Sequence, residues 1–212
     1  MESTLRKTAP KNLEIIETLC FKPDEGFIRL PGHIDRLEAT CSKLRYSFDR
    51  GAVLMALGQA VGNEPLRVRL TININGKIDV KVGKIQNVEH WNIGISDRVL
   101  SSIDPWLSVK TTNRIIYDTE RANLKDLDEL LFLNENDEVC EGTITNVFLL
   151  VDDLFLTPPL RCGCLPGVLR QEMLLNGKAK EEVLYLEDLI IPNKLFVGNS
   201  LRGLIPADLI QR

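Results

Sequence analysis

Glu141 stands between two apolar runs, and its position raises a question of charge pairing. The run Leu130–Leu133 and the turn Asn134-Glu-Asn-Asp137 precede it, and the run Phe148–Val151 follows it. Short apolar runs bounded by turn residues are typical of buried strands. A carboxylate between two such strands is costly unless a cation or hydrogen-bond donors meet it. Glu141 therefore either faces water at a strand end or holds a specific partner, and the pattern alone leaves both readings open.

Cysteine is the second residue type that could do chemistry in this chain. The five cysteines are Cys20, Cys41, Cys140, Cys162 and Cys164. Cys162-Gly-Cys164 lacks the usual Cys-x-x-Cys spacing, and the two histidines, His33 and His90, are far away in sequence, so we expect no metal site. The odd cysteine count, without an apolar N-terminal stretch typical of a signal peptide, predicts reduced thiols and a cytoplasmic protein.

Composition excludes several classes of partner. The chain has 212 residues, enough for one large domain or two small ones with a core of their own. Its net charge of −4 argues against nucleic-acid binding, which requires basic patches. No apolar run approaches the length needed to span a membrane, so no membrane partner is expected.

The first half of the sequence predicts a small sheet with helices. We expect a strand over Leu13–Phe21, a short return strand over Phe27–Leu30, and a helix after Pro31-Gly32 with an apolar stripe of Ile34, Leu37, Cys41, Leu44 and Phe48. His33, Arg36 and Thr40 share the flank beside that stripe, and a second helix ends at Gly62. Alternation from Leu66 to Ile74 and from Ile78 to Val82, around Asn75-Gly76, predicts a hairpin.

The second half predicts a larger, strand-rich domain. We interpret Ser96–Trp106 as a linker between domains 1–100 and 101–212, and expect a helix from Ser108-Val-Lys110 to Ala122. Further strands are predicted at Leu130–Leu133, Glu138–Val151, Leu154–Thr157, Glu181–Tyr185 and Lys194–Val197; helices at Gly167–Leu175 and Leu186–Ile190; and a tight turn at Gly198–Gly203. The predicted fold class is α/β (α+β).

Several separated motifs in this order carry a family resemblance. The motifs are Glu141-x-x-x-x-Asn146-Val-Phe148, Leu156-Thr157-Pro-Pro159 and Gly163-x-Leu-Pro-Gly167-Val-Leu-Arg170. Together they resemble the signature of the class IV (fold-type IV) pyridoxal-phosphate aminotransferases, which include branched-chain and D-amino-acid aminotransferases and aminodeoxychorismate lyase. The resemblance runs from about Leu13 to about Pro206. The segment Lys110-Thr-Thr-Asn-Arg114 with Tyr117-Asp118 is most similar to the aminodeoxychorismate lyases, especially those fused to a chorismate-amination component.

The resemblance implies that Lys110 and Glu141 take part in the chemistry of the cofactor. Lys110 would hold the pyridoxal phosphate aldehyde as an imine, and its freed amine would later move the substrate's α-proton. At a predicted helix start, the helix dipole would lower its pKa, although many surface lysines also lie near helix ends. Glu141 would accept the hydrogen bond of the protonated pyridine nitrogen, which answers its pairing question.

The resemblance also implies a phosphate cup. Arg36, in a His-x-x-Arg pattern, would bind the phosphate, although a solvated helix flank is the alternative. The N–H groups of Val168 and Leu169 open a helix, and free N–H groups there bind anions. Ser200 would donate its hydroxyl and Leu201 its backbone N–H. Leu165 corresponds to an apolar residue near the cofactor ring.

Two arginines and two departures bear on the substrate. Arg114 and Arg202 could each contact a substrate carboxylate or form a surface ion pair. Branched-chain members place a tyrosine where this chain has Ile115, and we expect Tyr117 to face elsewhere. The family's extra N-terminal strand and glycine-rich turn precede the segment that matches Glu14–Thr18, and neither is found here, as in the fused lyase type.

Three functions remain, and the first is favoured. It is a lyase that eliminates pyruvate from aminodeoxychorismate and leaves 4-aminobenzoate, a folate precursor. The second is a small aminotransferase for D- or branched-chain amino acids, and the third is a cofactor-free binding module. Lys110, Glu141 and Arg36 argue against the third. The resemblance further implies a cofactor cleft between the domains, a homodimer, and a chorismate-amination enzyme as a possible partner.

Overall fold

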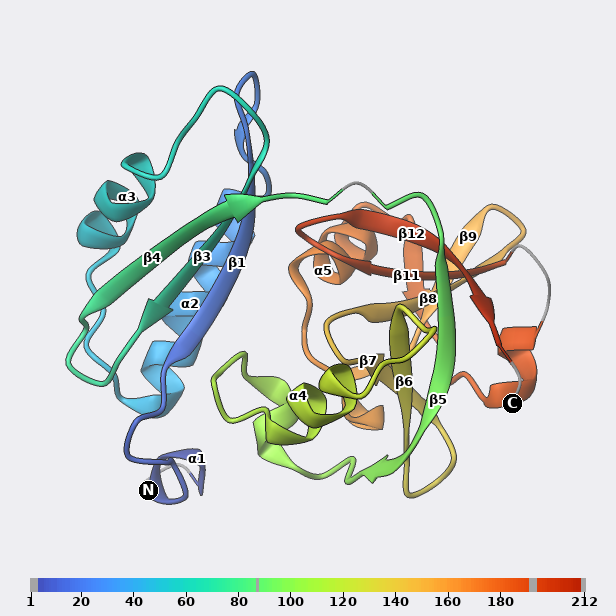
Figure 1. Ribbon diagram of the computed structural model, residues 1–212. Helices are drawn as coiled ribbons and strands as arrows, with labels where there is room; N and C mark the ends of the chain where they lie inside the picture. Colours follow the sequence, from blue (N-terminus) through green and yellow to red (C-terminus); the bar gives the residue numbers. More distant parts are fainter. Residues whose placement is uncertain (1–3, 87, 191–193, 211–212) are drawn as a thin grey trace. The chain divides into compact units, whose positions relative to one another are not determined.

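The computed structural model describes residues 4–86, 88–190 and 194–210. Its contacts divide the chain into two compact units. The first unit comprises Met1–Asn87 and Val109–Asn113, and the second comprises Val88–Ser108 and Arg114–Arg212. Both units combine a sheet with helices, which confirms the predicted α+β class (Figure 1).

The first unit is built on a four-stranded antiparallel sheet in the order β2-β1-β3-β4. Its strands are β1 (Ile15–Lys22), β2 (Gly26–Phe27), β3 (Leu66–Ile72) and β4 (Ile78–Lys84), and its helices are α1 (Thr4–Lys7), α2 (Leu30–Leu44) and α3 (Arg50–Gly58). The predicted hairpin is confirmed: Ile72 pairs with Ile78, and Gly76 takes the positive φ of +77° that its turn requires.

Helix α2 packs on β1 as its apolar stripe predicts (Figure 1). Pro31 lies in its first turn, where the missing N–H costs no helical hydrogen bond. The stripe residues Ile34, Leu37, Cys41 and Leu44 are all buried, but Phe48, the fifth predicted member, lies beyond the end of α2 and is only partly buried. This packing leaves the polar flank of α2 facing Glu17 of β1, which matters for the site below.

The second unit is an eight-stranded mixed sheet in the order β10-β9-β8-β11-β12-β5-β6-β7. Its strands are β5 (Trp91–Leu100), β6 (Glu129–Asn134), β7 (Val139–Gly142), β8 (Asn146–Val151), β9 (Leu154–Thr157), β10 (Ala179–Glu181), β11 (Leu195–Asn199) and β12 (Gly203–Leu209). Helices α4 (Ile115–Ala122) and α5 (Val168–Leu175) and the 3-10 turns η1 (Pro105–Ser108), η2 (Leu160–Cys162) and η3 (Leu186–Ile190) connect the strands.

The core of the second unit lies along the central strands of this sheet. Ile93, Leu131, Val147 and Val197 are fully buried there and pack in one cluster. A second cluster joins Phe148 of β8 to Leu169 and Met173, so α5 is fastened to the sheet by its apolar face. Strand β7, through Val139, and helix α5 are therefore both packed against the core of the second unit.

Three predicted elements are wrong, and one strand is missing from the prediction. The expected linker begins inside β5, which continues to Leu100. The helix expected from Ser108 begins at Ile115, because residues 110–112 pair with residues 14–16 at the start of β1 instead. The expected strand Glu181–Tyr185 is replaced by the shorter β10, which ends at Glu181. No strand is predicted after the turn at Gly198–Gly203, where the structure has β12.

Within the described residues, no helix is both long enough and apolar enough to cross a membrane.

Candidate functional site

Glu141 is held in the second unit by two hydrogen-bond donors. It lies on β7, is 6% exposed, and receives the Tyr117 hydroxyl on Oε1 at 2.7 Å and the Leu165 N–H on Oε2 at 3.0 Å. A buried carboxylate needs such donors. The reading that puts Glu141 in water at a strand end is therefore wrong. Tyr117, for which no role at the cofactor was expected, is a partner of this carboxylate.

Tyr117 is fixed on α4 so that its hydroxyl meets Glu141. Its ring packs edge-on against Phe132, with centroids 5.2 Å apart, and the Arg114 guanidinium lies 5.4 Å from the ring centroid. Burial raises the pKa of Tyr117, and the Glu141 charge and hydrogen bond raise it further. The hydroxyl therefore stays protonated and serves as a donor.

Leu165 is clamped at both of its backbone groups. Its N–H donates to Glu141, and its carbonyl accepts from Asn146 Nδ2 at 3.0 Å and from the Gly167 N–H at 2.8 Å. A Cβ on Gly167 would overlap the Asn146 side chain, so only glycine fits this close approach. Glu141 and Asn146 thus fix the loop that leads into α5.

Helix α5 presents an N-terminus without a side-chain cap. Gly167 is its N-cap residue and supplies no capping side chain. The first N–H groups of a helix have no partner inside the helix and favour an anion. Val168 and Leu169 carry two of these groups, which matches their predicted role in a phosphate cup.

The turn 199–202 between β11 and β12 is organised by Asn199. Its Oδ1 accepts the backbone N–H groups of Leu201 at 3.1 Å and Arg202 at 3.0 Å. The Leu201 N–H, expected to point at a phosphate, is thus directed at a side chain of the same turn. Ser200 is 7% exposed within this turn.

Arg36 belongs to a buried charge cluster in the first unit. Its Nε and Nη2 donate to the two oxygens of Glu17 at 2.8 and 2.6 Å, and His33 Nδ1 lies 2.6 Å from Glu17 Oε2. Because the Arg36 side chain is only 9% exposed, the solvated-flank reading is wrong. Burial raises the pKa of Glu17, but the Arg36 charge and the bonds from His33 and Arg36 outweigh it and lower that pKa to about 2.

This cluster fixes the plane of the Arg36 guanidinium. A side-on pair through Nε and Nη2 is bidentate, and it turns Nη1 away from Glu17. Thr40 Oγ1 also donates to the Arg36 carbonyl at 2.8 Å. The shared flank of His33, Arg36 and Thr40 was visible in the sequence, whereas Glu17 on the facing strand was not.

Lys110 lies on an extended segment of the first unit. Its carbonyl accepts the Ile16 N–H at 2.8 Å, and the neighbouring Thr111 pairs with Ile15 in an antiparallel bridge. Helix α4 begins five residues later, at Ile115, so the argument that a helix dipole lowers the Lys110 pKa is wrong. Pairing with the residues that open β1 fixes its backbone instead.

The predicted residues thus fall into two groups. Arg36 and Lys110 belong to the first unit. The second unit holds the others, and hydrogen bonds tie Glu141 to Leu165 and Leu165 to the loop that opens α5.

The two arginines considered for the substrate differ in their surroundings. Arg114 pairs with Asp118 at 2.7 Å and donates to the Thr143 carbonyl at 2.9 Å, so it supports the chain itself. The Arg202 guanidinium lies over the Trp91 ring, 5.7 Å from its centroid.

The cysteines are free thiols in the interior. Cys140 Sγ donates to the Cys162 carbonyl at 3.0 Å, and burial raises the pKa of Cys140. In the described part of the chain, no group of three or more His, Cys, Asp and Glu residues could hold a metal ion.

Comparison with known proteins identifies relatives over almost the whole chain. The family model described as amino-transferase class IV matches residues 14–210. A relative from Schizosaccharomyces pombe, named "Putative aminodeoxychorismate lyase", is 30% identical over 200 residues, which cover 88% of this chain and 86% of the relative. A "Probable branched-chain-amino-acid aminotransferase" from Thermotoga maritima is 28% identical over 47% of this chain and 38% of its own length.

A solved structure matches the fold closely. The crystal structure of a "Putative amino-acid aminotransferase" from Mesorhizobium loti superposes on this chain with a TM-score of 0.89 and is 37% identical in sequence. The match covers 93% of this chain and 100% of that one. The fold is therefore shared with this solved structure over nearly the whole chain.

Proposed function

The chain belongs to the class IV aminotransferase family of pyridoxal-phosphate enzymes, and on that premise we propose that it is a 4-amino-4-deoxychorismate lyase. The reaction releases pyruvate from the substrate and leaves 4-aminobenzoate. The observation that carries this choice is the relative named as such a lyase, which aligns with most of both chains. The segment from Lys110 to Asp118, which resembles the lyases, points the same way.

Glu141 would meet the pyridine nitrogen. Bound pyridoxal phosphate supplies an electron sink for the negative charge that develops on the substrate when a proton leaves. Glu141 is buried and oriented by Tyr117 and Leu165, and each carboxylate oxygen can accept more than one hydrogen bond. It can therefore take the ring N–H without losing either donor, and its negative charge keeps that nitrogen protonated.

Lys110 would hold the cofactor through its amine and then move protons. Its half-buried side chain extends from a backbone that is paired with the residues opening β1, so the amine starts from a fixed point. As a base it would take the proton from the substrate carbon that bears the amino group. Returning that proton to the departing enolpyruvyl group gives pyruvate, which balances the reaction.

A phosphate cup would combine a charge with backbone donors. Arg36 is held by Glu17 so that its guanidinium is preoriented, and the uncapped N-terminus of α5 supplies N–H groups. The Ser200 hydroxyl adds a donor, and Leu165 would pack near the ring. Leu201 would act indirectly, because its N–H donates to Asn199 Oδ1 and so helps to fix the turn 199–202 that carries Ser200. These residue types fit a phosphorylated pyridine ring: an acid, an amine, an arginine and a helix N-terminus.

Arg202 is our candidate for a substrate carboxylate. It follows Ser200 in the turn that Asn199 organises, and Arg114 is already used by Asp118 and Thr143.

The proposal also includes a homodimer and a chorismate-amination enzyme as the source of the substrate.

An aminotransferase for D- or branched-chain amino acids is the second candidate. The 37% identity to a structure named as an amino-acid aminotransferase favours it. Both activities would use Lys110 and Glu141 in the same way, so a measurement must separate them.

The test uses the purified protein loaded with pyridoxal phosphate. We expect pyruvate and 4-aminobenzoate to form in equal amounts from aminodeoxychorismate, and the cofactor absorption band to stay in place with D-alanine or L-leucine. Conversion to the pyridoxamine form by one of these amino acids, without pyruvate release from aminodeoxychorismate, would establish the aminotransferase instead.

A further inference from the structure

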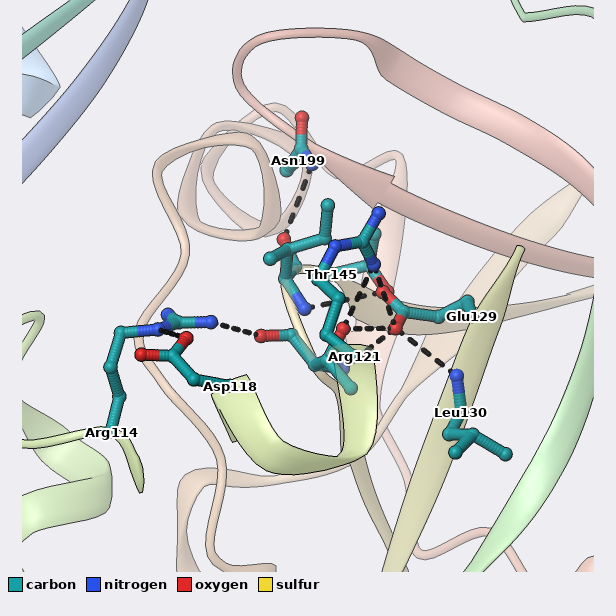
Figure 2. A network of polar contacts seen from close by, with 9 residues as sticks. Arg114, Asp118, Arg121, Glu129, Leu130, Thr145 and Asn199 are labelled. Atoms are coloured by element: carbon teal, nitrogen blue, oxygen red, sulfur yellow. Dashed lines mark hydrogen bonds and ion pairs between the residues drawn. The ribbon is translucent and has the colours of Figure 1, made fainter. Parts of the chain in front are cut away.

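Glu129 is a fully buried carboxylate that the proposed chemistry does not use. It opens β6 and is 0% exposed. Its Oε1 accepts the Thr143 N–H at 3.0 Å and the Thr143 hydroxyl, and its Oε2 accepts the Ile144 N–H at 3.2 Å and the Thr145 hydroxyl at 3.0 Å. Figure 2 shows several dashed contacts meeting at the Glu129 carboxylate. Arg121 Nη1 lies 3.5 Å from Glu129 Oε1. A buried charge with this many donors is a built feature, because an unpaired one is costly.

The segment that Glu129 holds is the turn 143–145 between β7 and β8. This turn joins Glu141, near the end of β7, to Asn146, which opens β8. The carboxylate lies so close that a Cβ on Gly142 would be 2.9 Å from Glu129 Cδ. Glu129 therefore determines the positions of Glu141 and Asn146, the two residues that hydrogen-bond the Leu165 backbone.

The same turn is tied to the turn 199–202 through its opposite side. The Ile144 carbonyl accepts from Asn199 Nδ2 at 3.2 Å, as Figure 2 shows. Asn199 Oδ1 in turn accepts the N–H groups of Leu201 and Arg202, the two residues that follow Ser200 in the turn 199–202. One turn thus connects the acid Glu141 with the turn that carries Ser200, and both belong to the second unit.

We propose that Glu129 is a positioning residue that sets the separation between Glu141 and the Ser200 turn through residues 143–145. The inference rests on the proposed function, in which these two points meet opposite ends of pyridoxal phosphate. The ring nitrogen and the phosphate of that molecule are separated by a nearly fixed distance. A site that grips both ends at once must present its two partners at the matching separation.

The charge of Glu129, and not only its shape, is required. Glu129 Oε1 faces the backbone N–H groups of Thr143 and Leu130, and Oε2 faces that of Ile144. A glutamine amide must point its NH2 group at one of these donors, whichever way it is turned, and a backbone N–H cannot rotate away. Glu129→Gln therefore leaves a buried donor unsatisfied and displaces the turn.

The test compares pyridoxal phosphate with pyridoxal, which has the ring but no phosphate. Dissociation constants are measured by fluorescence titration for the wild type, Glu129→Gln, Asn199→Ala and the double variant, with the exposed Glu182→Gln as control. The quantity compared is the ratio of the dissociation constant of pyridoxal to that of pyridoxal phosphate, which we call the phosphate advantage. This ratio should be about tenfold smaller in each single variant than in the wild type, the order expected for one buried donor left unsatisfied. The control should keep the full advantage.

The double variant separates positioning from general weakening. Asn199→Ala removes both the bond to Ile144 and the acceptor of the Leu201 and Arg202 N–H groups, so the double variant should lose little more than Asn199→Ala alone. Additive losses, or an unchanged phosphate advantage with only a lower melting temperature, would overturn the proposal. Thr145→Val, which removes one hydroxyl donor and no backbone partner, serves if Glu129→Gln does not fold. A wild-type protein that binds no pyridoxal phosphate would instead contradict the proposed function itself.

Discussion

The Tyr117 hydroxyl donates to Glu141 Oε1 at 2.7 Å, so the acid at the centre of the site is oriented by a residue from helix α4. The two residues are 24 positions apart in sequence. Tyr117 lies in the first turn of α4, which begins at Ile115. The contact makes α4 part of the site although the helix buries no residue completely.

Removing this hydroxyl should weaken the site without unfolding it. Tyr117→Phe keeps the ring contact with Phe132 but leaves Glu141 with one donor fewer. Hydrogen bonds to charged groups contribute about 1.5–3 kcal/mol, so we expect turnover to fall by about tenfold or more. Steady-state kinetics would check this, with Tyr185→Phe, which changes an exposed tyrosine, as the control. Unchanged turnover would mean that Tyr117 does not orient the acid.

Lys110→Ala should abolish turnover and the absorption band of the lysine-bound cofactor, because no other group is proposed to hold the aldehyde. Folding should be retained, since the backbone bond to Ile16 does not need the side chain. Lys43→Ala, at an exposed position of α2, is the matched control. Normal turnover by the Lys110 variant would end this mechanism.

The Glu17 cluster should give the protein a recognisable acid sensitivity. The pKa of Glu17 is lowered from 4.5 to about 2, so the charged form stabilises the folded state fully above pH 4.5. That contribution, about 3 kcal/mol, is lost as the pH falls from 4.5 towards 2. Thermal unfolding from pH 6 to pH 3 should therefore show a steeper loss of stability for the wild type than for Glu17→Gln. Parallel curves would refute the assigned pairing.

Gly142→Ala should destabilise the fold by about 1–3 kcal/mol, the usual cost of overpacking. The added methyl group would stand 2.9 Å from the Glu129 carboxyl carbon, in a place where neither the turn nor the carboxylate can move easily. Gly58→Ala is the control, because no atom lies within 4 Å of its Cβ position. Chemical denaturation measures both, and equal stabilities would show that the turn around Glu129 is loose.

The sequence predicts what depends on local pattern and misses what depends on distant contacts. The hairpin of β3 and β4 follows from strict alternation and Asn75-Gly76, and α2 follows from its apolar stripe. Lys110 was placed on a helix because the residues around it are compatible with one, but pairing with the start of β1 prevails.

The polar supports of the site could be anticipated only in part. Glu129 and Glu141 are both acids next to apolar strands, and the threonines Thr143 and Thr145, which follow Glu141, offer hydroxyl donors, which is a signal that could have been read. The bond from Asn199 to the Ile144 carbonyl gave no such signal, because these two groups come together only when β8 and β11 pair.

The most direct test of the account is to find the residue that binds the cofactor. Borohydride reduction of the protein loaded with pyridoxal phosphate makes the bond between lysine and cofactor permanent, and peptide mass spectrometry then locates it. We predict one labelled peptide, with the label on Lys110, and loss of that label in Lys110→Ala. A label on another lysine, or no label in a protein that binds the cofactor, would contradict the site described here.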